Sequence, residues 1–102
     1  MVREMRKLRR LLKKNNFMFR EEQVSYTEII YWDRFKVHLF NNENDKIRTI
    51  SIVNGFGSYG GYDINNPKNK GLIEVLIKDK DEEYGNLTAK EVIKILKEEG
   101  GF

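Results

Sequence analysis

The stretch from Val24 to Val53 constrains the fold more than any other part of the chain, because it alternates β-branched and aromatic residues with short polar clusters. Three strand candidates lie there, and the segments between them are too short for a crossover connection, so neighbouring strands must pair antiparallel. The candidates are Ser25 to Trp32, Phe35 to Phe40 and Ile47 to Val53, with a tight hairpin at Asp33-Arg34 and a longer turn at Asn41 to Asp45.

The second of these candidates alternates in polarity along its length. Phe35, Val37 and Leu39 fall on one face, and Lys36, His38 and Phe40 fall on the other. A sheet with this pattern buries one side and exposes the other. We therefore expect helices to cover the apolar side.

A basic helix is predicted at the N-terminus. Apolar residues recur there at helical spacing, at Met1, Met5, Leu8 and Leu12, which predicts a helix over about residues 2 to 14. The pair Asn15-Asn16 is a typical helix stop, because asparagine tolerates the left-handed conformation.

The C-terminal helix has the clearest boundary signals. Thr88 and Glu91 have the spacing of a capping box, and Leu87 and Val92 stand at the positions of a hydrophobic staple. These signals predict a helix from Ala89 to Glu99 that is closed by Gly100.

A second C-terminal helix is favoured over residues 69–79. Leu72, Ile73, Leu76 and Ile77 repeat at helical spacing, although the run is short enough that a strand remains open. The expected order is α-β-β-β-α-α, an α+β fold with an N-terminal basic helix, a three-stranded antiparallel sheet and two C-terminal helices. One domain would span residues 1–102, with a basic amphipathic helix (1–16), the sheet (24–53), a glycine-rich loop (54–68) and a helical part (69–99).

Composition excludes several kinds of site. The chain has no cysteine, which removes disulfides, thiolate zinc sites and cysteine nucleophiles. A single histidine, His38, excludes a multi-histidine metal site, and the acidic cluster of Asp79, Asp81, Glu82 and Glu83 lacks the spacing of a calcium loop. No nucleophile with an adjacent base is marked. We expect no catalytic residue, no metal and no cofactor.

Two properties predict the location. No apolar run approaches the length of a membrane span, and the basic N-terminus is not followed by the apolar stretch of a secretory signal. We expect a cytoplasmic protein, in a bacterial host, without a membrane partner.

Charge is strongly segregated along the chain. The net charge is +3, yet residues 1–20 hold eight Lys and Arg against Glu4 alone. Helices this basic bind phosphate backbones or acidic protein surfaces. The alternative is that the apolar stripe docks on the sheet while the cations only solvate the helix. The candidate binding residues in the helix are Arg3, Arg6, Lys7, Arg9, Arg10, Lys13 and Lys14.

The segment from Asn54 to Asp63 holds four of the eight glycines. It lacks the lysine of a P-loop and the context of a dinucleotide fingerprint, so a phosphate cradle is not favoured. Its aromatic residues Phe56, Tyr59 and Tyr62 are candidate anchors for a partner, because tyrosine is frequent in binding loops. The alternative is a structural loop with these aromatics tucked in.

Three short blocks resemble small uncharacterised proteins of phages and prophages of Gram-positive bacteria. Within about residues 55–96, the blocks are Gly57-Ser58-Tyr59-Gly60-Gly61, Gly71-Leu72-Ile73-Glu74 and Tyr84-Gly85-Asn86-Leu87-Thr88-Ala89-Lys90-Glu91-Val92. The resemblance carries no catalytic residues. It implies a phage setting, in which small binders such as anti-CRISPR and other anti-defence proteins occupy host machinery.

Three functions follow as hypotheses. The first is a non-enzymatic interaction protein that inhibits or recruits a host nucleic-acid-associated protein through the basic helix. The second is a nucleic-acid-binding module in which Arg20, Arg34 and Lys36 add phosphate contacts. The third is a homo-oligomer in which the basic end of one chain meets the acidic body of another.

Overall fold

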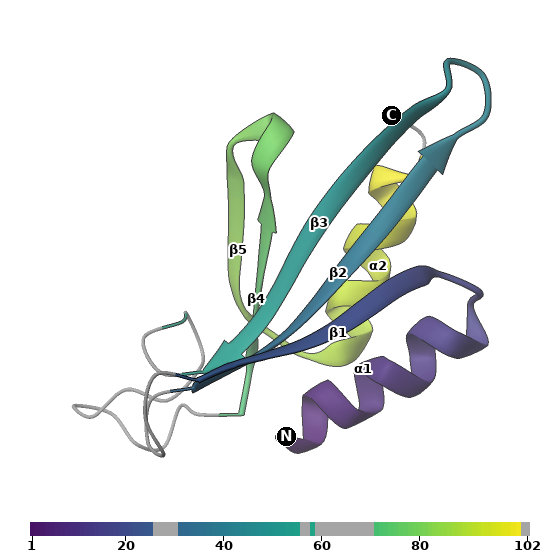
Figure 1. Cartoon of the computed structure of the whole chain (residues 1–102). Coiled ribbons are helices and arrows are strands. Elements are labelled where there is room, and N and C mark those ends of the chain that lie inside the picture. Colours follow the sequence, from purple (N-terminus) through teal and green to yellow (C-terminus); the bar gives the residue numbers. More distant parts are fainter. Residues whose placement is uncertain (26–30, 56–57, 59–70, 101–102) are drawn as a thin grey trace.

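The computed structural model describes residues 1–25, 31–55, 58 and 71–100. Within these residues the chain forms two α-helices, one 3-10 turn and a five-stranded antiparallel sheet in which strand order follows chain order (Figure 1). The elements are α1 (Arg3–Lys14), β1 (Met18–Ser25), β2 (Tyr31–Asn41), β3 (Lys46–Gly55), β4 (Ile73–Ile77), η1 (Lys78–Lys80), β5 (Glu82–Leu87) and α2 (Ala89–Glu99).

Both helices cover the same face of the sheet, with α1 along β1 and α2 beside α1, behind β2 in this view (Figure 1). The core between the layers joins the inward residues of the strands to one row from each helix, and most of its members are fully buried. The α+β class is therefore confirmed. The core residues of the sheet include Phe35, Val37, Ile50, Ile52, Ile73, Val75 and Ile77.

The first helix is docked on the sheet. Met5, Leu8 and Leu12 each have an exposed fraction of 0%, as expected for one stripe of an amphipathic helix. Asn15 ends the helix, and its side-chain amide donates a 2.7 Å hydrogen bond to the Leu11 carbonyl. Asn16 follows with φ of 59°, so the predicted stop is confirmed.

The second helix begins with the predicted capping box. The Thr88 backbone N–H donates to Glu91 Oε1 at 3.0 Å, and the Glu91 N–H donates to Thr88 Oγ1 at 3.4 Å. The Glu91 carboxylate also accepts from the Thr88 hydroxyl at 3.0 Å. The bonds it accepts from Thr88 lower the pKa of Glu91, with the bond from the Thr88 backbone as the largest cause. Leu87 and Val92 are both buried in the core, as a staple requires.

The predicted three-stranded sheet and second C-terminal helix are wrong. Residues 73–77 form β4, and β5 follows after η1, so the sheet has five strands in the described residues. The apolar run fits both the helical and the strand period, but Ile73, Val75 and Ile77 all point into the core, which is the two-residue period of a strand. The turn after η1 uses Asp81, at φ of 53°, to reverse the chain.

The predicted hairpin at Asp33-Arg34 is also wrong, because both residues lie inside β2. Their side chains hydrogen-bond to the residues directly opposite them on β1. Gln23 Nε2 donates to Asp33 Oδ1 at 3.2 Å, and the Arg34 guanidinium donates to Glu22. The real partner of β2 on that side is Met18–Ser25, a segment that lies mostly before the predicted start of the sheet.

Candidate functional site

The outer surface of α1 carries an unbroken row of cations. Six of its basic side chains lie opposite the buried stripe, and five of the six are exposed, with Lys7 partly buried. Within the described chain, none of the six makes an ion pair with a carboxylate. We call this row the cationic stripe, and it consists of Arg3, Arg6, Lys7, Arg10, Lys13 and Lys14.

The acidic groups near the stripe are engaged elsewhere. Glu4 is the only acidic residue of α1, and its Oε1 accepts a 3.0 Å hydrogen bond from the Ala89 N–H at the start of α2. Glu21 on β1 accepts from Arg9 Nε at 2.8 Å. Arg9, the seventh candidate residue of the helix, thus links α1 to the sheet and is not part of the cationic stripe.

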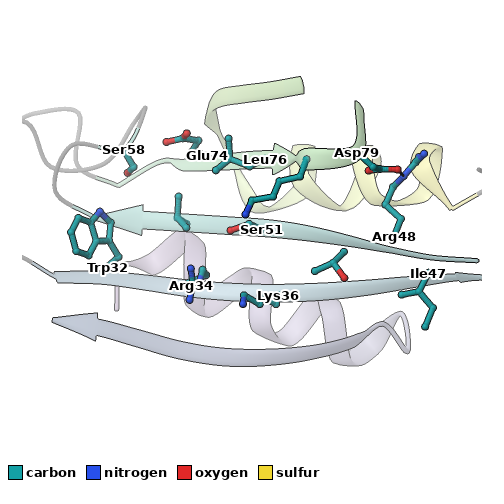
Figure 2. Close-up of a pocket in the computed structure, with 13 residues that line it drawn as sticks. Trp32, Arg34, Lys36, Ile47, Arg48, Ser51, Ser58, Glu74, Leu76 and Asp79 are labelled. Carbon is teal, nitrogen blue, oxygen red and sulfur yellow. Dashed lines mark hydrogen bonds and ion pairs between the residues drawn. The ribbon is translucent and has the colours of Figure 1, made fainter. Parts of the chain in front are cut away.

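The face of the sheet that the helices leave uncovered is hollowed. We call it the open face. A concavity of about 1050 Å³ lies over β3 and β4, bordered by Trp32, Arg34 and Lys36 of β2 (Figure 2). Ser51 forms part of its floor, and Leu76 lies along β4.

Three further cations of the nucleic-acid hypothesis lie on the open face, around one carboxylate. Glu22 pairs with Arg20 at 2.8 Å, with Arg34, and with Lys36 at 3.8 Å. The hydrogen bond from Arg34 is the largest cause of the lowered pKa of Glu22. Arg20, Arg34 and Lys36 are therefore partly neutralised, and they face away from the cationic stripe.

One end of the open face is apolar. The hairpin of β2 and β3 extends past both flanking strands, since β1 reaches only His38 and β4 reaches only Ile50 (Figure 1). Phe40 and Ile47 stand opposite each other on this extension and are 54% and 64% exposed. Met18, beside His38, is 71% exposed. Large apolar side chains this exposed in one place are typical of contact surfaces.

A charge cluster fixes the C-terminal end of α2. Glu99 accepts from Arg48 on β3 at 2.7 Å and from Lys80 on η1 at 2.9 Å. The bond to Glu99 is the main cause of the raised pKa of Lys80. Tyr84 donates to Glu82 at 2.7 Å, which raises the pKa of Tyr84 and lowers that of Glu82. This cluster holds the sheet to α2, so its role is structural.

A comparison with protein-family models, curated proteins and solved structures found no match. The resemblance of residues 55–96 to phage proteins therefore remains an expectation. No helix within the described residues is long and apolar enough to span a membrane.

The remaining candidates divide into those the structure describes and those it does not. Phe56, Tyr59 and Tyr62 lie outside the described residues. His38 is half-buried on the open face, with Nδ1 3.0 Å from Thr49 Oγ1. No group of three or more metal-ligating side chains is found among residues the structure describes.

The open face is the candidate surface that sequence reasoning did not assemble. Its signal is the exposed pair of Phe40 and Ile47, which flank the predicted turn and become cross-strand neighbours only once the hairpin register is known.

Proposed function

We propose that the protein is a non-enzymatic nucleic-acid-binding module that holds a phosphate backbone along the cationic stripe. The observation that carries this proposal is that six cations share one helix face and make no ion pair with a carboxylate in the described chain. Unpaired cations in a row release the counterions of a polyanion when they bind it, which drives nucleic-acid association.

The geometry of the stripe suits a phosphate backbone. Arg3 and Lys14 bound a helix of twelve residues, which spans about 16 to 18 Å at 1.5 Å per residue. Duplex DNA presents a negative charge roughly every 1.7 Å of its axis when both strands are counted, so roughly ten phosphates fall within this length of duplex and the helix faces part of them. Since three of the six are arginines, bidentate contacts to phosphate oxygens are available.

The burial of the apolar residues favours nucleic acid over an acidic protein. Met5, Leu8 and Leu12 are buried in the core, so the cationic stripe offers no apolar anchor to a partner. Protein interfaces draw their energy mainly from buried aromatic and aliphatic anchors with few charges at the centre. Phosphate contacts need no such anchor. They also carry no sequence information, so we expect binding without base preference.

The proposal is tested by titrating labelled DNA and RNA duplexes at several salt concentrations. The variant Arg6→Gln/Arg10→Gln/Lys13→Gln removes three stripe charges, and Lys90→Gln/Lys94→Gln/Lys97→Gln removes three exposed charges from α2 as a matched control. We expect the stripe variant to lose at least tenfold in affinity. The slope of the logarithm of the binding constant against the logarithm of salt concentration should decrease in magnitude by about 0.9 for each phosphate that the variant no longer neutralises. The control should change affinity less than threefold.

Two outcomes contradict the proposal. Equal losses in both triple variants mean that binding follows net charge and not the stripe. Absence of binding near physiological salt, with an acidic protein captured through the same six residues instead, favours the interaction-protein hypothesis. The latter result would mean that the cationic stripe binds a host protein.

A further inference from the structure

We propose that the open face is the interface of a symmetric dimer, in which a second copy of this chain packs face to face on the first. The open face has no helix of its own within the described chain, and it exposes the apolar end formed by Met18, Phe40 and Ile47. Sheets cover such faces by packing on another sheet at about 10 Å. The proposal does not rest on nucleic-acid binding, because it leaves α1 on the outside.

The two central strands of the open face differ in the size of their side chains. The residues of β2 that point outward are large, and the residues of β3 directly opposite them are mostly small. From one end of the hairpin to the other, the pairs are Trp32 with Gly55, Arg34 with Val53, Lys36 with Ser51, His38 with Thr49, and Phe40 with Ile47. The face is therefore a ridge along β2 beside a groove along β3, and the concavity described above lies over that groove.

A ridge beside a groove of the same length is self-complementary. A two-fold axis that runs parallel to the strands between β2 and β3 lays the ridge of each copy into the groove of the other. Each large residue of β2 then meets its small partner on the second copy. A two-fold interface requires this reciprocity. If one residue of the first copy contacts a second residue of the other copy, the same contact is repeated with the two copies exchanged.

Charge follows the same division. The outward cations of the two central strands, Arg34 and Lys36, are both on β2, and the outward residues of β3 are uncharged. The two-fold axis therefore places each cation against an uncharged side chain of the second copy and no cation against its equivalent. Like-charge juxtaposition, which opposes association, is avoided along the centre.

The apolar end adds to the match. Phe40 of each copy packs on Ile47 of the other, which covers both exposed side chains. On the flanks the same axis brings Glu22 near Glu74 of the second copy, a like-charge approach. The Arg34 guanidinium, which bonds Glu22, offsets part of this repulsion, and Glu74 is only 9% exposed.

The face is large enough for such a dimer. The outward positions number five on β2, five on β3, four on β1 and two on β4, and at ~4.8 by ~6.8 Å each they cover roughly 500 Å² in projection. Side-chain relief increases the accessible area. A standard interface buries about 800 Å² per partner. The exposed apolar end supplies the anchors that such an interface needs.

Sedimentation of the full chain over a range of concentrations tests the proposal, at about 0.05 and about 0.5 M NaCl, where screening differs strongly. We expect a monomer–dimer equilibrium that persists at high salt. Ser51→Tyr fills the groove and should weaken the dimer at least tenfold while the monomer stays folded, as judged by its thermal transition. Lys94→Tyr is the matched control, because Lys94 is exposed on α2, on the helix-covered side of the sheet, and should leave the dimer unchanged.

Phe40→Ser provides a second variant that removes an anchor without touching the groove, and it should weaken the dimer to a similar degree. A chain that stays monomeric throughout, or a dimer unaffected by both variants, would overturn the proposal. A dimer that dissociates at high salt would also overturn it and favour head-to-tail contact between the basic helix and the acidic body. Nucleic-acid binding is measured separately, since Ser51→Tyr leaves the cationic stripe intact.

Discussion

The two helices lie side by side on the same face of the sheet, but they use their charges differently. In α2 a capping box fixes the first turn, and Glu99 in the last turn is held by Arg48 and Lys80. In α1 the N-cap residue is Val2, which makes no side-chain cap, and the outer surface carries only cations. The polar groups of α2 thus stabilise the fold, whereas α1 depends on its buried stripe, and its six outward cations make no ion pair with a carboxylate in the described chain.

The largest predicted effect concerns the buried apolar stripe of α1. Leu8→Ala should lower the free energy of unfolding by about 3 kcal/mol, because a fully buried leucine leaves a cavity when truncated. Leu96→Ala in α2, at the same burial, should show a similar loss in chemical denaturation. A loss of less than ~0.5 kcal/mol for Leu8→Ala, as at exposed sites, would mean that α1 is not part of the fold.

The capping box gives a smaller effect that is specific to α2. Thr88→Ala should cost about 1 kcal/mol at pH 7. The lowered pKa of Glu91 means that its contribution is present above about pH 5 and is lost as the pH falls through the folded-state value. Glu91→Gln should therefore flatten the decline of stability on acidification, measured by denaturant midpoints between neutral and acid pH. An unchanged acid profile would assign that decline to other carboxylates, such as Glu22.

These local signals explain which elements the sequence could predict. Both helices carry caps or a stop together with a clear apolar stripe, and β3 is rich in β-branched residues, so all three are predictable. The edge strand β1 has mostly polar residues, and its inward residues include Glu21 and Gln23, which are satisfied by Arg9 and Asp33. Its identity as a strand depends on partners distant in sequence, which periodicity cannot reveal.

The same reasoning applies to β4 and to the site. Ile73 to Ile77 is compatible with a helix or a strand until the neighbouring strand β3 provides its partners. The cationic stripe could be identified from spacing alone, because its residues lie in one helix. The open face could not, since it combines four strands whose register is set by the whole sheet.

The smallest predicted effect separates the two uses of charge most clearly. Arg10 lies one helical turn from four other cations, Arg6, Lys7, Lys13 and Lys14, and like charges at this spacing destabilise a helix by about 0.2 to 0.5 kcal/mol per pair. Four pairs at the low end of this range, because the charges face solvent, mean that Arg10→Gln should raise the free energy of unfolding by about 0.8 kcal/mol at low salt. The gain should disappear when salt screens the charges. The same substitution should weaken nucleic-acid binding. Opposite signs in the two measurements would mean that the stripe is retained against stability because a ligand uses it. A loss of stability with unchanged binding would instead assign Arg10 to the fold, and α1 would then resemble α2.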